Sequence, residues 1–134
     1  MNDLLIGKIQ SIQRCVQRAR DECQKAGDSF RTNFTYQDAA VLNVTRACEM
    51  AIDLANHIIR KEKLGIPCSS AESFQLLSRQ GIISTELEKK MIAMVGFRNI
   101  AVHEYKKLNV EIVEHVIKHG LDDILVFTQL LINR

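Results

Sequence analysis

Apolar residues recur along most of the chain at alternating steps of three and four, the spacing that places them on one face of an α-helix. The pattern predicts long helices over residues 3–25, 35–63, 84–102 and 109–132, with a short helix between Ser69 and Gly81. No stretch shows the alternation that is typical of a β-strand. Connections of only a few residues join the helices, which favours antiparallel neighbours. We therefore expect an all-α single domain over residues 1–134, an antiparallel up-down four-helix bundle with one additional short helix.

Polar residues stand where these helices should begin. The predicted N-caps, whose side chains accept a backbone N–H of the first turn, are Thr35, Ser69, Ser84 and Asn109. Gly27 and Gly65 are placed to end the helices that precede them. The connection between the first two long helices contains Phe30 and Phe34, and both are expected to pack into the core.

The first two long helices differ in how much of their surface is apolar. The second is apolar over two neighbouring faces, so it should lie at the centre of the bundle or touch a second subunit. The first has one apolar stripe, and its opposite face carries Lys8, Arg14, Arg18 and Arg20. We interpret this basic face as solvated surface or as a contact for an acidic partner.

Composition supports a globular helical protein. Hydrophobic residues make up 46% of the 134 residues and charged residues 25%, which excludes a disordered chain. The formal net charge of +2 is too small for a protein that coats nucleic acid, although one basic cleft remains compatible with it. The four cysteines form no Cys-x-x-Cys pair and lie at no zinc-finger spacing from a His, so we expect reduced thiols.

No apolar run approaches the roughly 18 residues that a membrane span needs. The first residues also lack the basic and apolar regions of a secretory signal. We expect a cytoplasmic protein that does not enter the membrane.

The segment from Phe97 to Tyr105 stands out because Arg98, Asn99, His103 and Tyr105 fall within eight residues. A helix that only builds a core has no packing need for this set. An Arg can fork onto a phosphate and stabilise charge there, and a His can exchange a proton near neutral pH. Together they suffice for RNA cleavage without a metal, in which the His deprotonates the 2′-hydroxyl that attacks phosphorus. The alternative is a helix end where Arg98 makes a surface ion pair and His103 caps carbonyls.

The spacing of the two charged residues sets a geometric condition. Five residues along a continuous helix rotate by about 140°, so Arg98 and His103 would point in different directions. They can converge if the helix ends or bends near Val102, or if two copies meet across a symmetric interface.

The motif Arg98-x4-His103-x-Tyr105, with Asn99 after the Arg, resembles the signature of the HEPN superfamily and, more closely, of the HepT-type toxins. The runs at 52–58 (Ile-Asp-Leu-Ala-Asn-His-Ile), 64–67 (Leu-Gly-Ile-Pro) and 94–103 (Met-Val-Gly-Phe-Arg-Asn-Ile-Ala-Val-His) are similar to the same group. A bare Arg-x4-His is weak, whereas the longer motif near the end of the third long helix is specific. The resemblance extends over essentially the whole chain.

This resemblance implies a homodimeric, metal-independent endoribonuclease that acts as the toxin of a toxin–antitoxin system and needs no cofactor. Arg98 and His103 would be catalytic at a dimer cleft, with Asn99 in support. Tyr105 would accept AMP from an MntA-like minimal nucleotidyltransferase, the antitoxin, and the added charge and bulk would exclude RNA.

Several further residues are candidates for supporting roles. Glu49, Asp53 and His57 follow one another at intervals of four on the second helix, so Glu49 in particular could support the site, or the three could form a polar seam between helices. Lys106 and Lys107 could bind RNA or nucleotide phosphates, or could simply belong to a loop.

A metal site and two other functions complete the alternatives. His115 and His119, with Glu111 four residues before, share a helix face, which is far more typical of solvated surface than of a metal site. The alternative function is a non-catalytic nucleotide- or substrate-binding subunit of a nucleotidyltransferase complex. A purely structural helical dimer is a third possibility.

Overall fold

The computed structural model describes residues 3–132 and 134, and these residues form helices and turns without a strand. The helices are α1 (Asp3–Ala26), α2 (Phe34–Glu62), α3 (Ser70–Arg79), α4 (Thr85–His103), α5 (Val110–His115) and α6 (Leu121–Leu131). Two 3-10 turns, η1 (Gly27–Ser29) and η2 (Tyr105–Lys107), follow α1 and α4. A π-helical turn, η3 (Val116–Gly120), joins α5 to α6.

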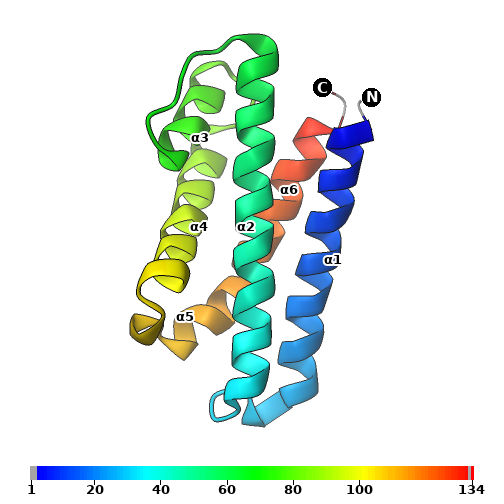
Figure 1. Cartoon of the computed structure of the whole chain (residues 1–134), viewed down its shortest axis with the longest axis vertical. Helices are drawn as coiled ribbons and strands as arrows, with labels where there is room; N and C mark the ends of the chain where they lie inside the picture. Colours follow the sequence, from blue (N-terminus) through cyan, green and yellow to red (C-terminus); the bar gives the residue numbers. More distant parts are fainter. Residues whose placement is uncertain (1–2, 133) are drawn as a thin grey trace.

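The long helices run alternately up and down, as Figure 1 shows for α1, α2, α4 and the final α5–η3–α6 segment. The centre of the bundle is α2, which contacts α1, α3, α4 and α6. This arrangement confirms the predicted bundle with one additional short helix, α3. Of the two alternatives expected for the second helix, the structure shows the central position. The predicted homodimer stays a prediction.

The core is built mainly from aliphatic side chains and three Phe residues that are almost fully buried: Phe30, Phe74 and Phe127. The rings of Phe74 and Phe127 pack edge to face with centroids 5.3 Å apart, which joins α3 to α6. Phe34 is 72% exposed. The expectation that both Phe residues of the first connection pack into the core is therefore wrong for Phe34 and confirmed for Phe30.

Three of the four predicted N-caps are confirmed. The side chains of Ser69, Ser84 and Asn109 accept the backbone N–H of Glu72, Leu87 and Glu111. The prediction of Thr35 is wrong, because α2 begins at Phe34 and its N-cap is Asn33, whose side chain accepts the Tyr36 N–H at 3.3 Å. Asn33 has an extended backbone, as an N-cap requires, and Thr35 already lies inside the helix.

The last predicted helix is interrupted by η3, where the chain makes one wider turn. Gly120 ends this turn beside α4, and a Cβ added there would lie 2.8 Å from the sulfur of Met94. The absence of a side chain at Gly120 thus lets the end of η3 approach α4 closely.

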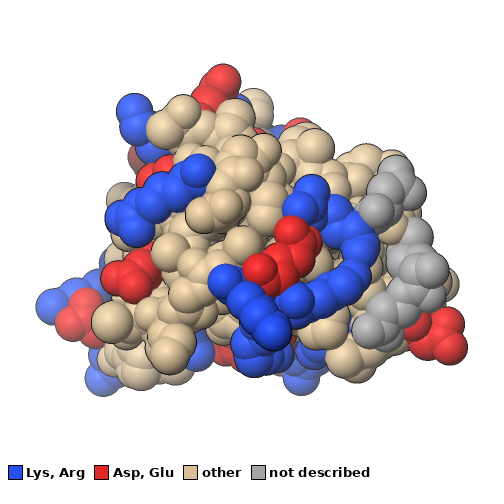
Figure 2. All heavy atoms as spheres, turned by 90° about the horizontal axis from the view of Figure 1, so that it is seen from above, with Lys and Arg blue, Asp and Glu red and all other residues tan. Residues whose placement is uncertain are grey.

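The end of the bundle at which α2 finishes is seen from above in Figure 2. Basic and acidic side chains lie beside one another on a mostly neutral surface, so this end carries no strong field of one sign. Glu62, in the last turn of α2, pairs with Arg134 at 2.6 Å. None of the described helices is long and apolar enough to cross a membrane.

Candidate functional site

Arg98 lies in the last two turns of α4 and is held against α2. Its Nε donates to Glu49 Oε1 at 3.3 Å, and its Nη1 donates to the Oδ1 of Asn99 at 3.1 Å. The Arg98 side chain is 29% exposed. Among the contacts of the described residues Nη2 donates to no acceptor, so one edge of the guanidinium fork is available for an anion.

His103 is the last residue of α4, and its side chain is exposed. The helical hydrogen bonds of α4 continue through its last residue, because the backbone N–H of Glu104 still donates to the Ile100 carbonyl. Arg98 and His103 therefore lie on one uninterrupted helix. Their side chains leave its axis about 140° apart, as five helical residues require.

Tyr105 lies in η2, beyond the end of α4. It makes the second contact between the motif and α2, after that of Arg98 with Glu49. Its hydroxyl donates a hydrogen bond to the carboxylate of Asp38, in the second turn of α2. Partial burial of the residue, which is still 44% exposed, this hydrogen bond and the negative charge of Asp38 together raise the pKa of Tyr105 to about 12. The phenol is therefore neutral near pH 7, and a carboxylate is already in place to accept its proton.

The two acidic residues that hold the motif lie on the same face of α2. Asp38 and Glu49 are eleven residues apart, which is just over three full turns and about 16 Å along the helix axis. Arg98 is fixed at one end of this span and Tyr105 at the other, and His103 comes between them in sequence. Leu42, which lies on this face between the two acids, is 48% exposed.

A cavity of about 300 Å³ adjoins Tyr105 and Asp38. Its walls include the exposed ring of Phe34, apolar side chains such as Val113, and Lys106. The cavity combines an aromatic face, a cation and a phenol, which is a suitable set for a nucleotide.

Comparison with known proteins assigns the chain to a family. Residues 12–131 match the ribonuclease HepT-like family. The chain belongs to the HepT-like ribonuclease family. The expected family and the expected class of enzyme, a ribonuclease, are confirmed by this match, which contains the whole Arg98–Tyr105 motif.

Two curated relatives agree with this assignment. The chain is 46% identical over 131 residues to the mRNA nuclease HepT of Shewanella oneidensis, an alignment that covers 98% of both chains. It is 30% identical over 82 residues to the tRNA nuclease HepT of Aphanizomenon flos-aquae, covering 61% of this chain and 56% of that one.

Solved structures match the whole fold. A tri-AMPylated HEPN toxin of Shewanella oneidensis, in complex with its MNT antitoxin, superposes with a TM-score of 0.94 at 44% identity and covers 100% of both chains. A toxin–antitoxin complex with AMP-PNP gives a TM-score of 0.92 at 44% identity, covering 98% of this chain and 99% of that one.

Of the three polar residues predicted to share a face of α2, only Glu49 reaches the motif. Asp53 is paired with Lys8 of α1 at 3.6 Å, so it contacts the opposite neighbour of α2. His57 is half-buried and forms no hydrogen bond or ion pair with the motif among the described residues. A supporting role at the motif is thus compatible with the structure for Glu49 alone.

The two lysines that follow the motif face different cavities. Lys106 lines the cavity beside Tyr105. Lys107 pairs with Glu104 at 3.7 Å and lines a larger cavity between α4 and the α5–η3–α6 segment. Only Lys106 is therefore placed to contact a phosphate near Tyr105.

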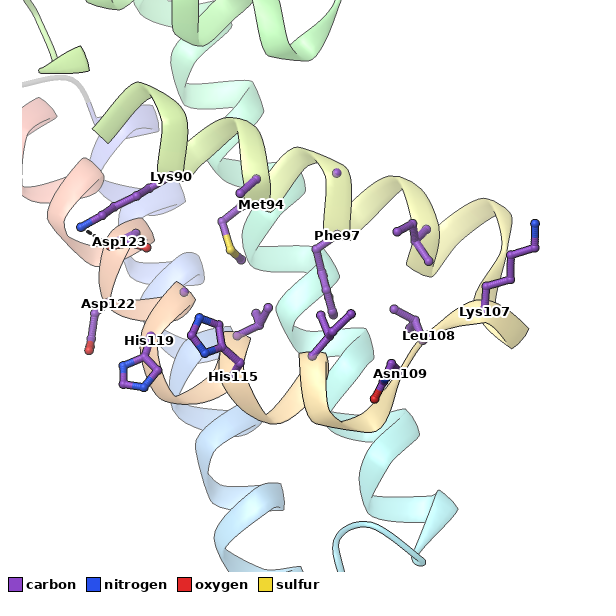
Figure 3. Close-up of a pocket in the computed structure, with 16 residues that line it drawn as sticks. Lys90, Met94, Phe97, Lys107, Leu108, Asn109, His115, His119, Asp122 and Asp123 are labelled. Atoms are coloured by element: carbon purple, nitrogen blue, oxygen red, sulfur yellow. Dashed lines mark ion pairs between the residues drawn. The ribbon is translucent and has the colours of Figure 1, made fainter. Parts of the chain in front are cut away.

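The larger cavity, about 780 Å³, lies between α4 and the α5–η3–α6 segment and is drawn in Figure 3. Its floor is apolar, with Phe97 and Leu108, and His115 and His119 stand at one end. The two rings are 4.9 Å apart, whereas Glu111 pairs with Arg31. In the described part of the chain no group of three His, Cys, Asp or Glu residues is arranged to hold a metal. Arg98, His103 and Tyr105 do not line this cavity.

Asp38 is a site residue that the sequence analysis did not single out. No local signal marks it: Asp38 and Glu49 are spaced by just over three turns of one helix, whereas Arg98 and Tyr105 are seven residues apart. The two separations differ, so the sequence alone does not indicate which acid contacts which motif residue.

Proposed function

We propose that the chain is the ribonuclease toxin of a toxin–antitoxin pair and that it cleaves RNA without a metal in a cleft between two copies. The family assignment and the full-length similarity to an mRNA nuclease support the reaction class. The observation that carries the proposal is the state of Arg98, which Glu49 and Asn99 orient while one edge of its fork stays open for a phosphate.

In this mechanism His103 takes the proton of the 2′-hydroxyl, and the resulting oxygen attacks the neighbouring phosphorus. A bond from the 2′-oxygen to phosphorus forms, the bond to the 5′-oxygen breaks, and the protonated His103 gives its proton to the leaving 5′-oxygen. Arg98 stabilises the negative charge that accumulates on the phosphoryl oxygens. Asn99 and Glu49 position Arg98 and need not touch the RNA.

A second copy of the chain can supply the His103 that Arg98 of the first copy does not meet on its own helix. Arg98 and His103 diverge on the continuous α4, so a helix break between them does not bring them together. Apolar side chains near the motif are exposed, among them Ile100 at 39% and Val102 at 46%. A symmetric partner would cover such a surface and bring its own His103 toward Arg98.

Tyr105 is the proposed acceptor of AMP from an MntA-like nucleotidyltransferase. The Tyr105 oxygen attacks the α-phosphorus of ATP, the bond to pyrophosphate breaks, and the phenolic proton passes to Asp38. The solved HEPN toxin that matches this chain is tri-AMPylated in its complex with the antitoxin, which supports the assignment. The added phosphate would place negative charge within the span between Asp38 and Glu49, where an RNA phosphate must bind.

The decisive experiment is RNA cleavage by the purified protein in EDTA, comparing the wild type with His103→Ala and Arg98→Ala. We expect cleavage by the wild type and loss of at least about 100-fold in each variant. If the wild type is inert on varied RNAs and its expression arrests no growth, the ribonuclease proposal fails and a nucleotide-binding subunit becomes the better interpretation.

Modification of Tyr105 is tested by intact mass after incubation with the nucleotidyltransferase and ATP. The wild type should gain AMP, and Tyr105→Phe should gain none. A mass shift that persists in Tyr105→Phe would show that another residue is the acceptor.

A further inference from the structure

A groove between α1 and α2 carries three arginines. The cavity has a volume of about 320 Å³, and its charged lining residues are Arg14 and Arg18 of α1 and Arg46, Glu49 and Asp53 of α2. The two helices lie side by side along most of their length in Figure 1. Both walls of the groove therefore present guanidinium groups. We call this feature the α1–α2 groove.

The packing of the bundle does not explain these arginines. Arg18 and Arg46 are exposed and form no ion pair among the described residues, and Arg14 donates only to the hydroxyl of Ser11 at 3.0 Å. By contrast, Arg20 of the same helix α1 is paired with Asp122 of α6 at 2.6 Å. Arginines of α1 are thus paired where they face α6 and unpaired where they line the groove.

The two acids of the groove already have partners outside it. Glu49 pairs with Arg98 of α4 at 3.3 Å, and Asp53 pairs with Lys8 of α1 at 3.6 Å. Three guanidinium groups therefore face a small space in which both carboxylates have a cationic partner. The groove therefore carries an excess of positive charge, although the formal net charge of the whole chain is only +2.

The groove begins at the candidate active site. Glu49 contacts Arg98 on one side and lines the groove on the other. Arg46 precedes Glu49 by three residues, so the two lie about one turn apart on α2, and Arg14 and Arg18 line the same groove from α1. One face of α2 thus connects the motif to the basic face of α1.

We propose that the α1–α2 groove binds the sugar–phosphate backbone of the RNA substrate beyond the scissile phosphate. The proposal rests on the ribonuclease function proposed above and extends its site. Arg suits this task because its planar fork binds phosphate oxygens in pairs. Arg14 and Arg18 are one helical turn apart, so their side chains contact neighbouring points of an extended strand. None of the residues that line the groove is aromatic, so it contacts the backbone rather than stacked bases.

The test is binding of a fluorescent 2′-O-methyl RNA, which lacks the attacking hydroxyl and stays intact. Anisotropy titrations at several salt concentrations compare the wild type with Arg18→Gln and Arg46→Gln. Each substitution should weaken binding about 3- to 10-fold near physiological salt and reduce the slope of log K against log salt by about 0.7 to 1. Arg79→Gln, which replaces an exposed arginine of α3 that forms no ion pair within the described chain, is the matched control and should change neither quantity.

The outcomes separate this proposal from the function on which it rests. If Arg18→Gln and Arg46→Gln bind the RNA as Arg79→Gln does, the groove proposal is overturned even when the wild type cleaves RNA. If both variants bind RNA normally but lose binding to the nucleotidyltransferase, the groove serves an acidic protein surface and the proposal is also overturned. If the wild type binds RNA through the groove and cleaves none, the groove proposal stands and the ribonuclease proposal fails.

Discussion

The hydrogen bond between Tyr105 and Asp38 leads to a prediction about the ionisation of the phenol. The pKa of Tyr105 is raised to about 12, with burial as the largest cause and Asp38 as the source of the hydrogen bond and the charge. Asp38→Asn keeps an acceptor of similar size and removes the negative charge. The burial of Tyr105 is unchanged, so the pKa should fall below 12 but remain above the ordinary value of about 10.

Two consequences follow for the variant. A raised pKa of an acid means that the folded state holds the proton more tightly than the unfolded state does. The contribution of Tyr105 to stability is thus complete below pH 10 and is lost as the pH rises through 12. Asp38→Asn should lose less stability over this interval than the wild type. It should also accept AMP more slowly, by about 100-fold or more, because the base that takes the phenolic proton is gone.

The assay is simple because the chain has two Tyr residues and no Trp. Subtracting the alkaline absorbance titration of Tyr105→Phe from that of the wild type isolates Tyr105, and circular dichroism verifies that the helices persist at each pH. A Tyr105 pKa near 10 in the wild type would refute the role of Asp38. So would an unchanged pKa in Asp38→Asn, or AMP addition at the wild-type rate.

Three further predictions concern phosphate binding, the core and the thiols. Lys106→Gln should weaken RNA binding by about 3- to 10-fold in anisotropy titrations and Lys107→Gln should not, because only Lys106 faces the cavity beside the motif tyrosine; equal effects would contradict this. Phe127→Ala should lower the free energy of unfolding in urea by about 3–5 kcal/mol, since its ring is fully buried, and a loss below about 1 kcal/mol would refute that packing. A thiol reagent at pH 8 should modify exposed Cys68 first and spare Cys48, whose pKa burial raises to about 12; mass spectrometry of the fragments decides, and early modification of Cys48 would contradict its burial.

Sequence patterns predicted the helices well because each boundary has a local chemical cause. Ser69 and Ser84 cap their helices as expected, since an isolated serine before an apolar run leaves few alternatives. Near the start of the second helix, Asn33 and Thr35 are both of a type that caps helices well. Which of them becomes the N-cap depends on the backbone conformation of the connection, which the sequence does not determine. In the structure the N-cap is Asn33.

The π-helical turn and the acid pairs were out of reach for a different reason. The buried positions Val113, Ile117 and Leu121 keep ordinary steps of four through η3, so periodicity does not reveal the wider turn. The contact of Tyr105 with Asp38 joins residues 67 positions apart and depends on how α4 lies against α2. Such pairings follow from tertiary packing, whereas the motif itself was visible in eight consecutive residues.

The position of Arg98 and His103 on one continuous helix makes the two-copy site testable by mixing variants. In a dimer of Arg98→Ala with His103→Ala, the first copy still offers His103 and the second still offers Arg98. If each site pairs Arg98 of one copy with His103 of the other, this mixed dimer keeps one intact site of two.

Random mixing forms the mixed dimer in half of the population, so about a quarter of wild-type activity should return. Each variant alone should stay inactive. The control is a mixture of the two variants under conditions in which their subunits do not exchange. No recovery in a mixture shown by native mass spectrometry to contain the mixed dimer would refute this pairing, because Arg98 and His103 would then have to act together from the same copy.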